Sequence, residues 1–118
     1  MIKFHELNSN EPFQIFKEKY NYAMSNGQKN IEAINISSFS KSLNEVNSRM
    51  VNIKIINNTN FIFFTNYESP KSRDFEEHNQ VTAVFYWNSV DVQIRFKAYI
   101  KKTSKSYNNN WNKFYLQP

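Results

Sequence analysis

The strongest constraint on the fold is a strict alternation of apolar and polar side chains between residues 90 and 103. The apolar members take every second position: Val92, Ile94, Phe96, Ala98 and Ile100. The polar positions between them are Gln93, Arg95, Lys97 and Tyr99. Successive side chains of a β-strand point to opposite faces of a sheet, so this period of two predicts one long strand with a single buried face.

Five further segments carry strand patterns: residues 33–37, 48–56, 61–65, 81–87 and 111–116. In the second of them, Val51, Ile53 and Ile55 occupy alternate positions and are expected on one face. Polar turns are predicted at 40–44, 57–60 and 88–89, and loops at 66–72 and 107–110. A short helix is expected near residues 73–78.

One long helix is predicted near the start of the chain. Its apolar residues recur at helical spacing: Phe13, Phe16, Tyr20 and Ala23. Pro12 suits the first helical turn, where its missing N–H has no intrahelical partner, and Gly27 suits the C-terminal cap. The helix is therefore expected from about Glu11 to Ser25, with its aromatic stripe packed in the core.

These elements predict a mainly β protein with one or two flanking helices and about six strands, mostly antiparallel. Strands of this length joined by short turns favour a barrel, because closure removes exposed sheet edges. With 118 residues, of which 40% are apolar, the chain has the size and core of one domain, expected over residues 1–118.

Several kinds of chemistry are excluded by the residue types that the chain lacks. Gly27 is the only glycine, so neither a P-loop nor a Rossmann turn can form. The absence of cysteine excludes disulfides and thiolate chemistry. His5 and His78 have no partner at metal-ligand spacing, and no metal site is expected. No apolar run reaches the length of a signal peptide or membrane span, so a cytoplasmic protein without membrane contact is expected.

A candidate anion site emerges from cations and hydroxyls on two neighbouring predicted strands. Arg49 and Lys54 bracket one strand, and Thr65, Ser69 and Lys71 surround the loop after the next. Adjacent strands bring side chains within reach, so Arg49 and Lys71 could converge on one phosphate through charge-assisted hydrogen bonds. The alternative is that these are solvated surface cations, in keeping with a net charge of +5.

Several of these segments resemble the pyridoxamine 5′-phosphate oxidase family. Residues 49–54 read R-M-V-N-I-K, like the family's R-M-V-L-L-K, and residues 61–73 read F-I-F-F-T-N-Y-E-S-P-K-S-R, like its Y-T-N followed by S-R-K. The likeness continues through A-V-F-Y-W at 83–87 and V-Q-I-R-F at 92–96, and E-P-F at 11–13 resembles the D-P-F of the family's first helix. The resemblance covers about residues 11–103.

The resemblance implies a split β-barrel homodimer with FMN in the cleft between subunits and a small-molecule substrate. Arg49 and Lys71 would hold the FMN phosphate with help from Ser69 and Thr65. Met50 and Val51 would line the flavin, and Gln93, as an inward-pointing polar residue, would hydrogen-bond near its ring. Phe64 and Lys54 would complete the cofactor site, and Lys54 would also face the substrate phosphate.

The departures from the family pattern fall mainly on the substrate side. Pro70 replaces the arginine of S-R-K, and Phe64 replaces the tyrosine before the threonine. The family's further ligands for the substrate phosphate have no counterpart, which leaves Lys54 alone for that role. The ending W-N-K-F-Y-L-Q-P resembles the family's W-x-x-x-R-L-x-P, which would make this a complete, internally shortened chain; alternatively Trp111 matches the family's substrate-loop tyrosine.

Three functions remain open at the level of sequence. The first is an FMN-dependent oxidoreductase acting on a small molecule, with weak or absent turnover of pyridoxamine 5′-phosphate. The second is an FMN carrier or sensor without turnover. The third, least favoured, is a basic barrel that binds single-stranded nucleic acid and stacks bases on Trp87, Tyr86 and Tyr99.

Overall fold

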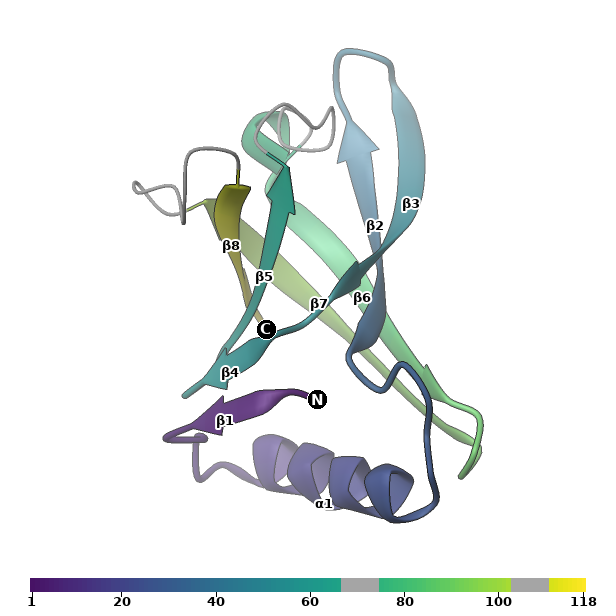
Figure 1. Cartoon of the computed structure of the whole chain (residues 1–118). Coiled ribbons are helices and arrows are strands. Elements are labelled where there is room, and N and C mark those ends of the chain that lie inside the picture. Colours follow the sequence, from purple (N-terminus) through teal and green to yellow (C-terminus); the bar gives the residue numbers. More distant parts are fainter. Residues whose placement is uncertain (67–74, 103–110) are drawn as a thin grey trace.

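The computed structural model describes residues 1–66, 75–102 and 111–118 (Figure 1). These residues form one long helix, a short helical segment at 75–77 and eight strands. In chain order the elements are β1 (Lys3–His5), α1 (Glu11–Ser25), β2 (Ala33–Ser40), β3 (Glu45–Asn52), β4 (Ile55–Asn57), β5 (Asn60–Asn66), β6 (Gln80–Trp87), β7 (Val92–Lys102) and β8 (Trp111–Gln117).

The eight strands form one sheet in the order β1-β4-β5-β8-β7-β6-β2-β3. All neighbouring pairs are antiparallel except β1 with β4, which is parallel. β3 and β4 follow each other along the chain, yet they lie near opposite ends of this order. The sheet must therefore curl round until its two ends approach, which gives a barrel (Figure 1).

The barrel turns its corner between Ile53 and Lys54. The Ile53 N–H donates to the carbonyl of Glu32, just before β2, at 2.8 Å, whereas the Lys54 N–H donates to Ile62 on β5 at 2.9 Å. The strand thus leaves one partner and joins another within a single peptide. The Lys54 carbonyl also accepts from the Lys3 N–H at 2.9 Å, which attaches β1 to the same corner.

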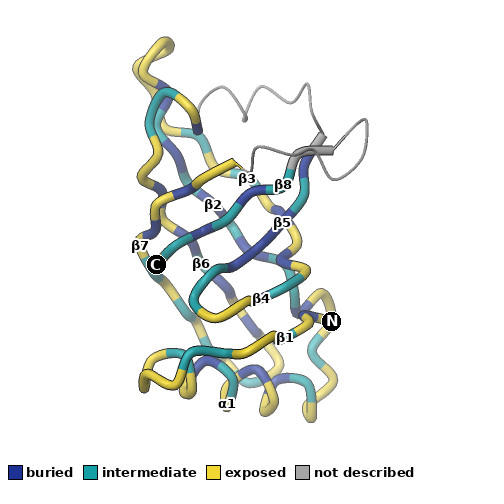
Figure 2. Tube along the Cα trace, turned by 90° about the vertical axis from the view of Figure 1, so that its left-hand side faces the viewer, coloured by how far each residue is buried: buried dark blue, intermediate teal, exposed yellow. Residues whose placement is uncertain are grey.

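Helix α1 covers one end of the barrel (Figure 2). It supplies aromatic side chains to the core. Phe16 packs against Phe61, Phe85 and Trp87, with ring centroids 5.3–5.5 Å apart. The indole of Trp87 is buried, and its Nε1 donates to the Ile31 carbonyl at 3.0 Å. The expectation that Trp87 offers a stacking surface is therefore wrong, because its ring belongs to the core.

The ends of α1 agree with the sequence prediction. Proline lies in its first turn, and the helix spans Glu11–Ser25 as expected. At the other end Gly27 has a φ of +71°, and its N–H donates to Met24, while the N–H of Gln28 donates to Ala23. These two bonds make a Schellman motif, in which a residue of left-handed conformation satisfies the last carbonyls of the helix.

Two features of the sheet differ from the prediction. The six-strand count is corrected to eight, because the segment predicted at 48–56 divides into β3 and β4 and because β1 adds a three-residue strand. The corner also changes which side chains face inward. Ile53 and Ile56 are fully buried, whereas Ile55 is partly exposed, so the expected alternation of Ile53 with Ile55 does not continue past the corner.

Candidate functional site

The candidate site lies along the free edge of β3, which we call the seam. Among the described strands, β3 is at the end of the sheet and pairs only with β2. Its other edge is directed towards β5, which β3 also approaches. The seam, formed by Glu45–Asn52, is thus a place where the barrel stays open between two strands.

The backbone of β3 presents polar groups to the seam. In an antiparallel pair, residues alternate between those that bond the partner and those whose N–H and C=O point away from it. Ile53 bonds the segment of β2, so the alternation directs the N–H and C=O of Met50 and Asn52 to the other side. The N–H of Lys54 points to that side as well, since it donates to Ile62 on β5. The seam can therefore hydrogen-bond a ligand that lies along it.

Arg49 extends from β3 towards the inner side of the barrel. Its Nη1 donates to the Ser38 hydroxyl at 3.2 Å, and its Cζ lies 5.3 Å from the centroid of the Phe75 ring. Ser38 is buried, and Arg49 is partly buried. A planar guanidinium held in this way suits bidentate recognition of a phosphate or carboxylate, because its donors lie in a fixed fork.

Thr65 and Phe64 lie near the end of β5 and point to opposite sides. Thr65 is buried and continues the inward alternation of Phe61 and Phe63, whereas Phe64 is partly exposed. Thr65 therefore shares the interior side with Arg49. Ser69 and Lys71 lie outside the described residues, so their convergence with Arg49 on one anion stays a prediction.

Met50 and Val51 point to opposite faces of β3. Val51 is buried in the core, while Met50 is 58% exposed on the outer face and accepts a contact from Asn35 Nδ2 at 3.6 Å. A ligand on the outer face can therefore meet the side chain of Met50 but not that of Val51.

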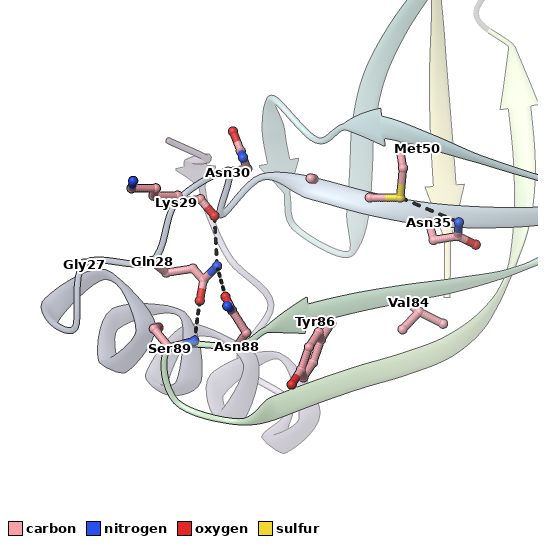
Figure 3. A pocket seen from close by; sticks show the side chains of 11 residues that line it. Gly27, Gln28, Lys29, Asn30, Asn35, Met50, Val84, Tyr86, Asn88 and Ser89 are labelled. Atoms are coloured by element: carbon pink, nitrogen blue, oxygen red, sulfur yellow. Dashed lines mark hydrogen bonds between the residues drawn. The ribbon is translucent and has the colours of Figure 1, made fainter.

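Met50 borders an open groove of about 670 Å³ on the outer face of the barrel (Figure 3). Tyr86 and Val84 line it from β6, and the turns after α1 and after β6 close one end. There the side chain of Gln28 bonds the Lys29 carbonyl, Asn88 Oδ1 and the Ser89 N–H. The groove therefore has a fixed polar end and a wall with exposed aromatic and thioether groups.

Gln93 does not point inward. It is exposed on the outer face, because Val92 and Ile94 on either side of it face the core. Its partner in the sheet is Tyr86 on the neighbouring strand β6. Three strand spacings, roughly 14 Å, separate β7 from β3 in the order of the sheet. One chain therefore does not bring Gln93 together with Arg49.

Lys54 lies at the corner where the seam ends. Its Nζ is 3.7 Å from Glu32 Oε1, and the amino group of Met1 donates to Glu32 Oε2. The hydrogen bond from Met1 is the main reason that the pKa of Glu32 lies below its ordinary value, and the Lys54 ammonium adds to this effect against the opposing influence of burial. Lys54 thus already has an acidic neighbour.

Ser38 and Glu32 are not among the site residues predicted from the sequence. The strand predicted at 33–37 extends to Ser40, and continuing the alternation of Ile34 and Ile36 places Ser38 inside the barrel. That pattern was sufficient to find Ser38. Nothing in the sequence pairs Glu32 with Lys54, because they meet only through the corner.

Among the residues that the structure describes, no helix has the length and apolar character needed to cross a membrane. Within the same residues, no group of three or more His, Cys, Asp or Glu side chains could hold a metal ion.

Similar proteins are found both among curated sequences and among solved structures. No family model matches the chain. The pyridoxine/pyridoxamine 5′-phosphate oxidase of Colwellia psychrerythraea is 40% identical over 100 residues, which are 84% of this chain and 46% of that protein. A pyridoxamine 5′-phosphate oxidase-related, FMN-binding protein from Nostoc punctiforme superposes with a TM-score of 0.79 at 9% identity, over 93% of this chain and 82% of that one. HutZ, a heme storage protein from Vibrio cholerae, gives a TM-score of 0.67 at 10% identity, over 86% and 88%.

The curled sheet with its open seam is therefore the barrel of the pyridoxamine 5′-phosphate oxidase-like proteins. The chain belongs to the pyridoxamine 5′-phosphate oxidase family. It spans about half the length of the curated relative described above.

Proposed function

We propose that this chain binds FMN and acts as a flavin-dependent oxidoreductase on a small molecule. The observation that carries the proposal is the placement of Arg49, which lies over Phe75 and bonds Ser38 beside the open edge of β3. A cation fixed next to a row of backbone donors and acceptors suits a ligand with a phosphate at one end and a flat polar ring at the other.

The residues present fit FMN. Arg49 would take the phosphate, with Thr65 on the neighbouring strand and with Ser69 and Lys71 as the family resemblance predicts. The backbone of Met50 and Asn52 would hydrogen-bond the ring along the seam. When bound, the flavin supplies the redox chemistry, and the protein orients it and excludes water from it.

We also propose that the working form is a homodimer with the flavin between two copies. Gln93 lies on the outer face, three strands from β3, so it would reach a flavin held by Arg49 of a second copy rather than of its own. The same outer face exposes the large apolar side chains of Met50, Tyr86 and Tyr99. Such a face is consistent with a contact between subunits.

The test of the cofactor proposal is FMN retention by Arg49→Ala. Wild-type protein is expected to be yellow and to keep a flavin spectrum after desalting. A charge-assisted hydrogen bond contributes about 1.5–3 kcal/mol, so Arg49→Ala should raise the Kd for FMN by about 10–100-fold. Fluorescence titration of the apoprotein with FMN measures this value.

The matched control is Lys19→Ala, which removes one positive charge from an exposed position on α1. It should leave the Kd for FMN unchanged. An equal loss of affinity in both variants would mean that only net charge matters, and a colourless wild type with no affinity for FMN would contradict the proposal.

An FMN carrier without turnover is the second candidate. It is supported by HutZ, a storage protein that shares this fold. Anaerobic addition of NADH or pyridoxine 5′-phosphate separates the two candidates. If the protein is an oxidoreductase that uses either donor, its flavin absorbance near 450 nm should fall at about the rate of turnover. Flavin that none of a panel of donors reduces would favour the carrier.

A further inference from the structure

The hydroxyl of Ser38 is buried in the barrel for a reason that the fold alone does not supply. Among the described residues, the buried serine and threonine side chains are Ser38, Ser40 and Thr65. A hydroxyl in the core costs free energy unless it is hydrogen-bonded. The Ser40 hydroxyl accepts from the Leu43 N–H at 3.3 Å and thus belongs to the turn after β2. Within the same part of the chain, the side chain of Ser38 hydrogen-bonds only to the guanidinium of Arg49.

The register of β2 and β3 brings these two side chains together. Arg49 lies opposite Ile36 across the pair. Ser38 is two residues further along β2 on the same, inner side, so it is a diagonal neighbour of Arg49. Diagonal neighbours lie about 7–8 Å apart, a gap that a long side chain can span. The Nη1 of Arg49 accordingly reaches the Ser38 hydroxyl at 3.2 Å.

Two contacts of different kinds restrict the guanidinium of Arg49. Ser38 accepts one of its N–H groups, and the ring of Phe75 lies against it with the centroid 5.3 Å from Cζ. A planar fork of donors suits a phosphate only when it is correctly oriented, and ordering a long side chain on binding costs entropy. Ser38 therefore removes, before any ligand binds, part of the freedom that a phosphate would otherwise have to remove.

We infer that Ser38 is a positioning residue, which orients the Arg49 guanidinium for the phosphate of the cofactor and so favours a phosphorylated flavin over riboflavin. Ser38 acts through Arg49 and has no part in the redox chemistry. This inference rests on the proposed function, since it takes Arg49 as the ligand of the FMN phosphate.

The test compares FMN with riboflavin, which differ only in the phosphate, by fluorescence titration of the flavin-free protein. Ser38→Ala should raise the Kd for FMN by about 3–10-fold, which is the scale of one side chain left to be ordered on binding. The Kd for riboflavin should change by less than about twofold, because no guanidinium contact to a phosphate is lost. Ser38→Thr keeps the hydroxyl and should restore most of the affinity for FMN. Equal weakening of both flavins in Ser38→Ala would mean a general disturbance of the barrel and would overturn the inference.

The matched control is Ser40→Ala, which removes a second buried hydroxyl from the same side of β2 without touching Arg49. It should leave the Kd for both flavins unchanged. A double-mutant cycle of Ser38→Ala with Arg49→Ala then shows whether the two residues act together. Ser38→Ala should have no further effect on FMN binding once Arg49 is absent, and independent, additive effects would refute the positioning role.

Failure of the proposed function is distinguishable from failure of this inference. If wild type binds no FMN, the cofactor proposal fails, and the inference is tested on the protein without flavin. The NMR signals of the Arg49 guanidinium, assigned by their loss in Arg49→Ala, report how fast its N–H protons exchange with water. Exchange should be at least about threefold faster in Ser38→Ala than in wild type and Ser40→Ala, because a hydrogen bond that slows it is lost. Equal rates in all three proteins would show that Ser38 does not hold the guanidinium.

Discussion

Inside the barrel, the phenyl rings of Phe63 and Phe114 lie stacked, with centroids 5.5 Å apart on paired positions of β5 and β8. Phe75 meets Phe114 edge-on at 5.3 Å, and Arg49 lies over Phe75. The guanidinium of Arg49 therefore packs on an aromatic cluster formed by Phe75, Phe114 and Phe63. A side chain supported in this way keeps its orientation before any ligand arrives.

Replacing Phe63 with alanine should weaken the fold strongly. The ring is fully buried, so its loss leaves a cavity and should lower the free energy of unfolding by about 3–5 kcal/mol. Urea denaturation followed by circular dichroism measures the change. Tyr22→Ala, at a 54% exposed position on α1, should change it by less than about 0.5 kcal/mol. Similar midpoints for the two variants would show that the aromatic cluster is not what stabilises the barrel.

Single residues also mark where sequence reasoning succeeds and where it fails. Alternation with Val51 and Phe63 is sufficient to place Arg49 and Thr65 on the inner side, because both belong to regular strands. The same rule puts Gln93 outside, and the contrary expectation came from the role assigned to it rather than from its position. The contact of Glu32 with Lys54 is not readable from any local pattern, since it depends on how the corner joins distant strands.

At the scale of elements, the helix was predictable and one strand was not. Four apolar residues at helical spacing, with a proline before and a glycine after, define α1 at both ends. The strand predicted at 48–56 is divided by an exchange of partners, and both of its halves remain extended. Local sequence encodes the extended conformation, but the choice of partner is a property of the whole sheet.

The end of α1 offers a direct test. Gly27 has a positive φ, and a Cβ added there would meet nothing within 4 Å, so Gly27→Ala should cost only the strain of the left-handed conformation. This strain is about 1–2 kcal/mol of unfolding free energy. Gly27→Asn should cost less, because asparagine tolerates that conformation. Thermal denaturation of the three proteins should rank them glycine, asparagine, alanine, and an alanine variant as stable as wild type would contradict the capping argument.

At the scale of the whole molecule, the described residues separate the groups expected to hold one flavin. Arg49 and Thr65 serve the inner side of the seam, while Gln93 and Tyr86 lie on the outer face of the sheet. Two copies that face each other would bring both sets to one ligand. The sequence could suggest this arrangement only through the family resemblance, because no pattern in one chain shows what a second copy covers.

The proposed homodimer predicts a mass of twice 14.2 kDa in solution. Tyr86 is 56% exposed on the outer face, and Tyr22 is 54% exposed on α1, so they form a matched pair. Tyr86→Lys should shift the mass towards that of one chain and weaken FMN retention, whereas Tyr22→Lys should do neither. Size-exclusion chromatography with light scattering measures the masses. A wild type that keeps its flavin as a monomer would refute the shared site.

The exchange of partners between Ile53 and Lys54 limits how the length of this chain can vary. Each side of that peptide is locked in phase by its own ladder, one to β2 and one to β5. Adding or deleting one residue here would shift the register of one half of the strand by one position. The inward side chains of that half would then face outward. Insertions should therefore be tolerated in the turns of the barrel but not at the Ile53–Lys54 peptide, because this peptide sets the register of the strands on both of its sides.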